Sequence, residues 1–317
     1  MSFPPFLTLA MDPLSPDLLR DFLPPDRPES LPLSFLHPGA LFLFSERIRY
    51  RILEGLFPDR LLIALTNDGA VFLPLPPRFF FDPGLSPRGR GESLREIFSR
   101  LSALFPDSPP PFLEGCPEEL LPDGPFRVEP GEREIVLAAS RLRLPRGNSG
   151  RTFRWEHNRL ERQWGPTGVR PIRPEDEAAV RALVAGFVDL RQRVARDSLE
   201  RAMASDMAGA FDRAMDPRWR GSLEGWLLEG RGELLAAGWY GRSASGRVLS
   251  GFLEARRIDL SNAGAPMMRK ILEADGGGGE RVAWVNIGGG AGIGGVEEAK
   301  RGRPHDRVLP LFRLLPA

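Results

Sequence analysis

The sequence has little of the chemistry that disulfides and metal sites require. Its 317 residues include one cysteine, Cys116, which has no second cysteine in the chain to pair with. The three histidines, His37, His157 and His305, lie far apart, and no His-x-x-x-His or Gly-x-Ser-x-Gly pattern occurs. We therefore expect no internal disulfide, no bound metal ion and no hydrolase triad.

A surplus of charge of one sign is also lacking, as are long apolar runs. Lys and Arg number 43 against 42 Asp and Glu, and the resulting net charge of +1 argues against a broad basic surface for gripping nucleic acid. We expect no DNA partner. No stretch reaches the ~18 consecutive apolar residues that a membrane-spanning helix needs. No basic region precedes an apolar core at the N-terminus. We expect a soluble, cytoplasmic protein without a transmembrane segment.

In the first half of the chain, short apolar runs alternate with turn residues. Leu61–Leu65 and Ala70–Leu75 flank Asn67-Asp68-Gly69, which is typical of a hairpin tip because these residues tolerate positive φ. Apolar residues recur at helical spacing over residues 92–104. Prolines gather over residues 106–130, which we interpret as the connection between two domains, 1–125 and 126–317.

The second half predicts helices, then a three-stranded meander, then a helix and further strands. The expected helices cover residues 151–165, 174–196, 197–215 and 263–274, and the meander strands cover 222–228, 233–240 and 248–255. Strands are also expected at 281–287 and 307–315, with a helix at 296–300 between them, while 134–142 fits a strand or a short helix. The order predicts an α+β fold with mixed, mostly antiparallel sheets flanked by helices, the layout of acyl-CoA N-acyltransferases (GNAT).

A glycine-rich segment follows the strand expected at 281–287. Residues 288–295 include Gly288, Gly290 and Gly292 and precede an expected helix start, where unpaired N–H groups favour a phosphate or carboxylate. These three glycines are therefore candidate ligand-binding residues. Too few residues follow them for a dinucleotide-binding βαβ unit, and a plain surface turn is the alternative.

Cations gather directly after these glycines. Lys300, one of two lysines in the chain, is followed closely by Arg303 and His305. Such a cluster can bind a phosphate, a lipid head group or the 3′ end of a tRNA. Favourable positive charge at the C-terminus of a helix explains it equally well.

Two polar residues lie at the ends of expected strands. The side-chain amide of Asn286 could fix a carbonyl group or could cap a turn. Glu254, in the sequence FLEARRID, could orient or deprotonate an attacking amine, or could simply pair with Arg256.

Residues 151–164 interleave arginine with tryptophan. Arg154 and Asn158 belong to this stretch, whose composition suits stacking on single-stranded nucleic acid. The alternative is a solvated amphipathic helix with its tryptophans in the core.

Together these motifs resemble the phosphatidylglycerol lysyltransferase C-terminal domain family. The resemblance rests on SFLHPGALFLFSERIRYRI and LLIAL near the start, the block RWEHNR at 154–159, Glu254, and Val285-Asn286-Ile287-Gly288 followed by Gly292-Ile293, Lys300 and Arg303-Pro304. Two departures occur: His157 stands where the family has arginine, and glycines rather than an acidic residue follow Asn286.

The resemblance implies a tandem pair of N-acyltransferase-like domains, the second carrying the glycine segment and the basic motif. Lipid-modifying relatives move an aminoacyl group from charged tRNA to phosphatidylglycerol. By this resemblance, catalysis falls to Glu254, Asn286 and Lys300. Binding of donor or substrate falls to Gly288, Gly290, Gly292, Arg303, His305, Arg154 and Asn158.

The expected activity is transfer of an aminoacyl group from charged tRNA to an amine or hydroxyl of a small molecule, a peptide or a lipid head group. No permanently bound cofactor is expected. An acyl-CoA donor is one alternative, and a non-catalytic ligand-binding module on the same fold is the other.

Overall fold

The computed structural model divides into two compact units. It describes residues 22, 41, 43, 48–53, 60–143, 147, 150–217, 222–243, 245–260, 263–274, 282–288 and 305–317. Unit 1 comprises Met1–Asp26, Phe44–Arg133 and Leu309–Ala317, and unit 2 comprises Arg27–Leu43 and Glu134–Val308. Two strands carry the chain between the units, β5 (Phe126–Ala138) and β11 (Arg307–Pro316). The division expected at residues 125/126 falls at the start of β5 and stays a prediction.

The described part of unit 1 combines a series of strands with a long helix. Its hydrogen-bonded order is β1 (Ile48–Leu53), β2 (Leu61–Thr66), β3 (Val71–Leu73), β4 (Phe112–Pro117) and β11. The predicted hairpin is confirmed, since β2 and β3 pair antiparallel and Gly69 has a φ of +88°. The predicted helix is α3 (Pro87–Leu104), which begins where the Ser86 hydroxyl accepts a hydrogen bond from Gly89 N.

The proline-rich stretch 106–130, expected to connect two domains, holds strands instead. It contains β4 and the first part of β5, and β4 pairs antiparallel with β11 from the far end of the chain. Leu113 and Cys116 of β4 are fully buried. Pro117 ends β4, Pro125 directly precedes β5, and Pro130 lies within β5. The composition of this stretch did not reveal these strands, because the partner of β4 lies almost two hundred residues away; its role as the connection between two domains stays a prediction.

Unit 2 is built on the strand order β5, β10 (Trp284–Asn286), β9 (Val248–Arg256), β8 (Glu233–Arg242), β7 (Glu224–Gly230) and β6 (Thr167–Pro171). The predicted meander is confirmed, since β7, β8 and β9 pair antiparallel in sequence order. The pair β9–β10 is parallel, and β10–β5 is antiparallel. The ambiguous residues 134–142 are the end of β5 followed by α4 (Ala139–Arg143).

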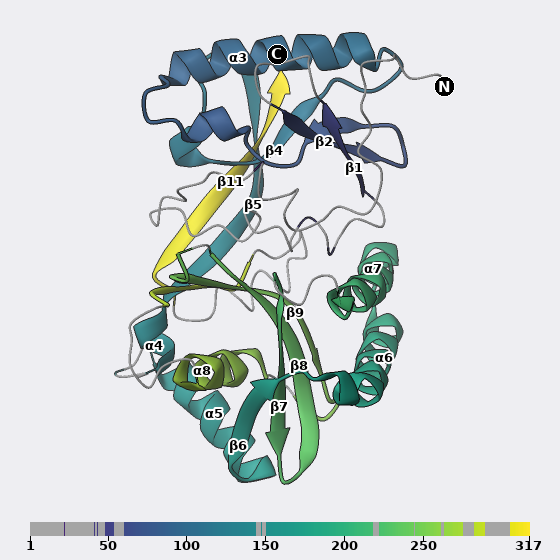
Figure 1. Cartoon of the computed structure of the whole chain (residues 1–317), viewed down its shortest axis with the longest axis vertical. Coiled ribbons are helices and arrows are strands. Elements are labelled where there is room, and N and C mark those ends of the chain that lie inside the picture. Colours follow the sequence, from purple (N-terminus) through teal and green to yellow (C-terminus); the bar gives the residue numbers. More distant parts are fainter. Residues whose placement is uncertain are drawn as a thin grey trace. The chain divides into compact units, whose positions relative to one another are not determined.

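Helices cover both faces of the unit 2 sheet (Figure 1). On one face, α8 (Gly264–Ala274) packs against α4 and α5 (Arg151–Trp164). On the other face lie α6 (Glu177–Val194) and α7 (Ser198–Ala214). Of these five helices, α5, α6, α7 and α8 were predicted from the sequence. The predicted α+β class, with mixed and mostly antiparallel strands flanked by helices, is confirmed; the helix expected at 296–300 lies outside the described residues.

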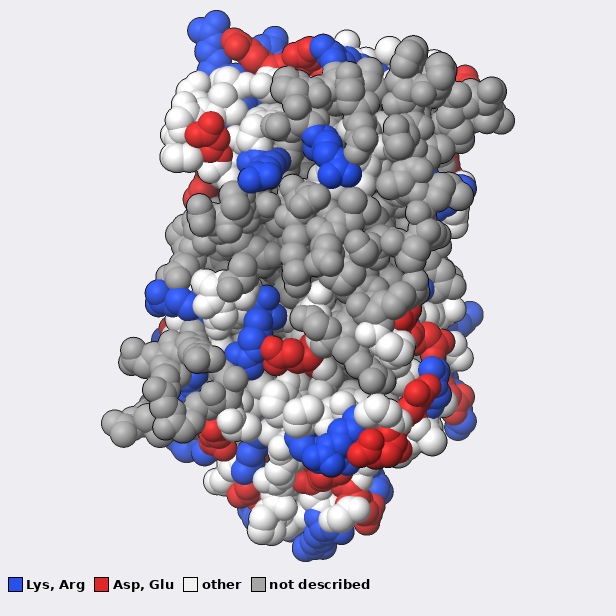
Figure 2. Space-filling view, in the orientation of Figure 1, with Lys and Arg blue, Asp and Glu red and all other residues white. Residues whose placement is uncertain are grey.

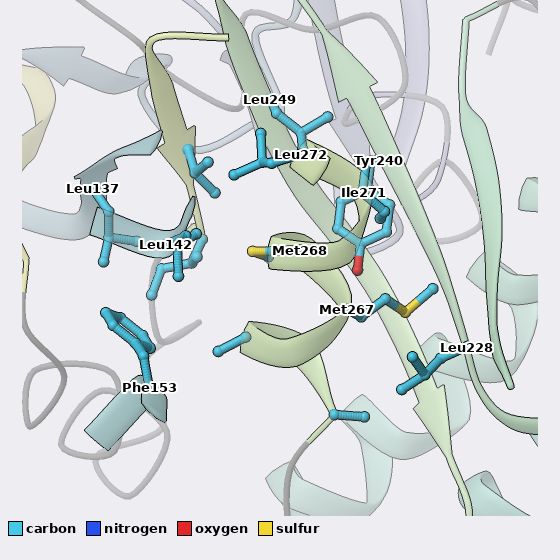
Figure 3. Close-up of a cluster of buried hydrophobic side chains, with 14 of the residues drawn as sticks. Leu137, Leu142, Phe153, Leu228, Tyr240, Leu249, Met267, Met268, Ile271 and Leu272 are labelled. Carbon is cyan, nitrogen blue, oxygen red and sulfur yellow. The ribbon is translucent and has the colours of Figure 1, made fainter. Parts of the chain in front are cut away.

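Apolar side chains of α8 form the centre of the unit 2 core. Met267, Met268, Ile271 and Leu272 point from this helix toward the sheet (Figure 3). They meet side chains of β5, α4, α5 and the meander, namely Leu137, Leu142, Phe153, Leu228, Tyr240 and Leu249. Burying a side chain of this size contributes about 1.5–3 kcal/mol, so this cluster fixes α8 on the sheet.

Two helix glycines make a matched pair for testing the packing of α3. A Cβ on the buried Gly91 would overlap the backbone carbonyl of Asp123, whereas a Cβ on the exposed Gly186 of α6 would meet nothing within 4 Å. We expect Gly91→Ala to destabilise unit 1 by about 1–3 kcal/mol and Gly186→Ala to stabilise unit 2 by about 0.5–1 kcal/mol. Urea unfolding of both variants checks this, and equal effects of the two substitutions would refute the packing described.

Candidate functional site

Strands β9 and β10 part after a short parallel pairing in unit 2. Val248, Leu249 and Ser250 of β9 face Trp284, Val285 and Asn286 of β10. The chain then turns to β5, where Ile287 N donates to Ile135 O at 3.0 Å and Ile135 N donates to Gly288 O at 3.4 Å. Beyond Ser250, β9 continues to Arg256, and the described part of β10 offers it no further partner. Asn286 is therefore the last residue of β10 that pairs with β9, and the two strands separate directly after it.

Asn286 holds this turn through two side-chain hydrogen bonds. The residue is fully buried; its Nδ2 donates to Glu134 Oε2 at 2.7 Å, and its Oδ1 accepts from Gly288 N at 2.6 Å. Gly288 has a φ of +68°, a conformation that favours glycine. The sequence left open whether the side-chain amide of Asn286 fixes a carbonyl group or caps a turn. The hydrogen bond from Gly288 N shows that it caps the turn.

Both flanks of residues 289–304 are fixed on the same strand, β5. On the far flank, Asp306 N donates to Val136 O at 3.0 Å. The Asp306 carboxylate accepts from Ala138 N at 2.7 Å and from Arg141 Nε at 2.6 Å. His305, half-buried, directly precedes this anchor. The candidates Gly290, Gly292, Lys300 and Arg303 lie outside the described residues, so the structure places only the ends of their segment.

Glu254 lies on the opposite face of the sheet from Asn286. Side chains alternate along a strand, and Val285, next to Asn286, belongs to the core under α8. The Glu254 carboxylate, by contrast, reaches the first residue of α8, since a Cβ on Gly264 would overlap it. It also pairs with Arg256 at 3.7 Å. The structure therefore does not place Glu254 and Asn286 side by side.

The position of Glu254 affects the electrostatics at the start of α8. A carboxylate at a helix N-terminus is favoured by the helix dipole. Nearby Tyr240 is buried, and burial, followed by the charge of Glu254, raises the pKa of its phenol well above 10. Tyr240 consequently stays protonated at neutral pH.

Arg154 and Asn158 lie on α5, together with the buried His157. Arg154 is half-buried and donates to Gly147 O at 3.0 Å, whereas Asn158 is exposed. His157 Nε2 lies 3.4 Å from Glu161, which also pairs with Lys270 at 3.3 Å. Burial, followed by the charge of Arg269, lowers the pKa of His157.

Sequence reasoning missed three buried polar residues, Glu134, Ser250 and Tyr240. Glu134 is 3% exposed, and its carboxylate accepts a hydrogen bond from the amide of Asn286, which offsets part of the cost of burying it. Its signal in the sequence was a carboxylate directly before the apolar run Ile135-Val136-Leu137. Ser250 is 4% exposed, and its register partner is Asn286.

The described residues contain no metal site, no membrane-spanning helix and no reactive thiol. No cluster of His, Cys, Asp and Glu there has the composition of a metal site. None of the described helices is long and apolar enough to cross a membrane. Burial raises the pKa of Cys116 to about 12, which makes its thiol a poor nucleophile at neutral pH.

Comparison with known proteins defines the fold. No protein-family model and no curated protein matches the sequence. A conserved protein of unknown function from Bacteroides thetaiotaomicron is similar with a TM-score of 0.74 and 14% identity, over 98% of this chain and 100% of that one.

Two further solved structures are similar to this chain over most of their length. L-PGS from Bacillus licheniformis has a TM-score of 0.55 and 14% identity, over 93% of each chain. The C-terminal DUF2156 domain of an Agrobacterium fabrum protein, proposed as a lysylphosphatidylglycerol synthetase, has a TM-score of 0.54 and 10% identity, over 88% of this chain and 87% of that one. The resemblance drawn from the sequence motifs is thus confirmed at the level of the fold.

The pair Asn286–Glu134 can be tested by exchanging its partners. Asn286→Asp places a second carboxylate against buried Glu134, and we expect a loss of about 3 kcal/mol or more in the free energy of unfolding. The double variant Glu134→Gln with Asn286→Asp again supplies one amide and one carboxylate, and should recover roughly half of that loss. Urea unfolding measures both. A double variant no more stable than Asn286→Asp would contradict the proposed pairing.

The lowered pKa of His157 predicts that the free energy of unfolding falls at mildly acidic pH. Its pKa in the folded state is lowered from the ordinary 6.5, so the unfolded chain takes up the proton first. The contribution of neutral His157 to the free energy of unfolding is fully present above about pH 6.5 and is lost as the pH drops toward the folded-state pKa of this residue. We expect His157→Gln to flatten the decline in melting temperature between about pH 7 and pH 5.5. Parallel declines in both proteins would refute it.

Proposed function

We propose that the protein is an acyltransferase that moves an aminoacyl group from charged tRNA to an amine or hydroxyl acceptor. The observation that carries the proposal is the parting of β9 and β10 at Ser250 and Asn286. An extended chain that bears amide groups can add to the edge of β9 as a strand adds to a sheet. The fold shared with L-PGS supports the same reaction class, although fold alone does not establish function.

In this proposal Asn286 acts through the backbone that it positions. Its amide is held by Glu134 and Gly288, so the donors to a developing oxyanion would be the N–H groups of Gly290 and Gly292. Lys300 and Arg303, with His305 beside them, would bind the phosphates of the donor.

The acceptor would be oriented by Glu254. Its carboxylate lies on the face covered by α8, while Asn286 faces the other side. Donor and acceptor would then reach the parted strands from opposite faces. The acceptor nitrogen or oxygen attacks the ester carbonyl carbon, the bond between this carbon and the 3′ oxygen of the tRNA breaks, and the proton lost by the acceptor is delivered to the departing 3′ oxygen.

The start of α8 favours charged tRNA over acyl-CoA as the donor. A helix N-terminus is a common site for the phosphates of a nucleotide. Here the carboxylate of Glu254 lies at Gly264, and Pro266 lacks an N–H group. Both features oppose binding of a CoA pyrophosphate at this helix.

A transfer assay with two donors tests the proposal. The full chain is incubated with a pool of charged tRNAs or with acetyl-CoA, and candidate amines and hydroxyl compounds are scored for product. We expect transfer from charged tRNA, lowered about 10- to 100-fold by Lys300→Ala through loss of a charge-assisted contact to phosphate. Arg88→Ala, an exposed residue of α3, is the control for charge.

Three outcomes would contradict this assignment. Transfer from acetyl-CoA alone would move the protein to the acyl-CoA-dependent N-acyltransferases. Stabilisation by a donor without any product would make it a ligand-binding module. Equal activity of Lys300→Ala and Arg88→Ala would remove Lys300 from the site.

A further inference from the structure

On helices α3, α6 and α8, several arginines pair with a carboxylate of the same helix. Arg88 pairs with Glu92 on α3 at 3.0 Å, Arg181 with Glu177 on α6 at 3.0 Å, and Arg269 with Glu273 on α8 at 2.7 Å. Arg100–Glu96 and Arg193–Asp189 repeat the arrangement. Figure 2 shows cations and carboxylates side by side over much of the lower part of the face drawn. Such surfaces have little net field.

Helix α5 departs from this pattern. Its exposed residues Arg151, Arg159 and Arg162 have no carboxylate within ion-pair distance in the part of the chain that the structure describes. Arg162 donates only to a backbone oxygen, that of Asn158, at 3.2 Å. The two acids of this helix, Glu156 and Glu161, are half-buried, and Glu161 lies against His157 and Lys270. Within the described residues, the exposed cations Arg151, Arg159 and Arg162 therefore have no ion-pair partner.

An exposed tryptophan lies among these arginines. Trp155 is 52% exposed, and the Arg159 guanidinium lies over its ring, 5.2 Å from the centroid. Arg151, Trp155, Arg159 and Arg162 follow one another at intervals of four, four and three residues, so they form one stripe along the helix. The stripe covers about three turns, or ~16 Å. We call these four residues the α5 arginine–tryptophan face.

We propose that the α5 arginine–tryptophan face binds single-stranded RNA, namely the 3′ end of the donor tRNA. This inference rests on the proposed function for the identity of the RNA. Exposed aromatic rings stack on bases and arginines bind phosphates, which is the combination that single-stranded nucleic acid requires. An anionic membrane is a poorer fit, because Trp155 is the one large apolar side chain among the exposed residues of α5.

Binding of a labelled single-stranded RNA ending in CCA, followed by fluorescence anisotropy, tests this face. We expect Trp155→Ala to weaken binding about 5- to 100-fold. Arg159→Ala should weaken it as well and lower the salt dependence by about 0.7 in the log–log slope. Arg193→Ala, on the exposed surface of α6 and paired with Asp189, is the matched control and should leave binding unchanged. Melting temperatures of all variants confirm that they fold.

Separate readouts distinguish failure of this inference from failure of the proposed function. If RNA binds and Trp155→Ala binds it equally well, the α5 face is not the RNA site. If charged tRNA serves as donor, Trp155→Ala should raise its KM and leave kcat unchanged, and an unchanged KM would overturn the inference while the transferase stands. RNA binding at α5 without any transfer would overturn only the proposed function. Binding to vesicles of anionic lipid and not to RNA would overturn the RNA assignment.

Discussion

The buried hydrogen bond between Asn286 and Glu134 fixes the point where strand β10 leaves its neighbour β9. It compensates a carboxylate that is 3% exposed, and the other half of the same amide holds the turn at Gly288. Because Asp306 anchors the returning chain to the same strand β5, the segment that contains the candidates Gly290, Gly292, Lys300 and Arg303 starts and ends at this strand. A buried polar pair is a demanding constraint, because removing one partner takes a hydrogen bond from a group that water does not reach. Its geometry therefore determines where the backbone turns at Gly288.

The two faces of the unit 2 sheet divide the polar groups between them. Glu254 lies against the start of α8, on the same face of the sheet as Tyr240 and Met268. Asn286, Glu134 and Ser250 lie on the other face. The carboxylate of Glu254 lies next to Gly264, at the positive end of the α8 dipole, where a phosphate group would otherwise be stabilised. The same interaction that stabilises α8 therefore occupies this end of the helix.

Local sequence signals determined much of the secondary structure. The hairpin at Asn67-Asp68-Gly69, the apolar spacing of α6, α7 and α8, and the alternation of the meander each depend on neighbours within a few residues. Such signals need no knowledge of the rest of the chain. The α+β class followed from the order of these elements, and the motifs around Asn286 pointed to the fold that the L-PGS structure shares.

The tertiary structure alone decided how distant residues combine. Residues 112–117 form a strand because β11 pairs with them, and 134–138 are strand because β10 does. The amide of Asn286 is held by a carboxylate 152 positions away in the chain, so its use as a turn cap could not be separated from a catalytic use by sequence. The sequence did not show that Arg151, Arg159 and Arg162 of α5 have no ion-pair partner among the described residues, whereas arginines of α3, α6 and α8 pair with carboxylates of the same helix. The physical reason is the same in each case: pairing and burial depend on proximity in space, which local patterns do not encode.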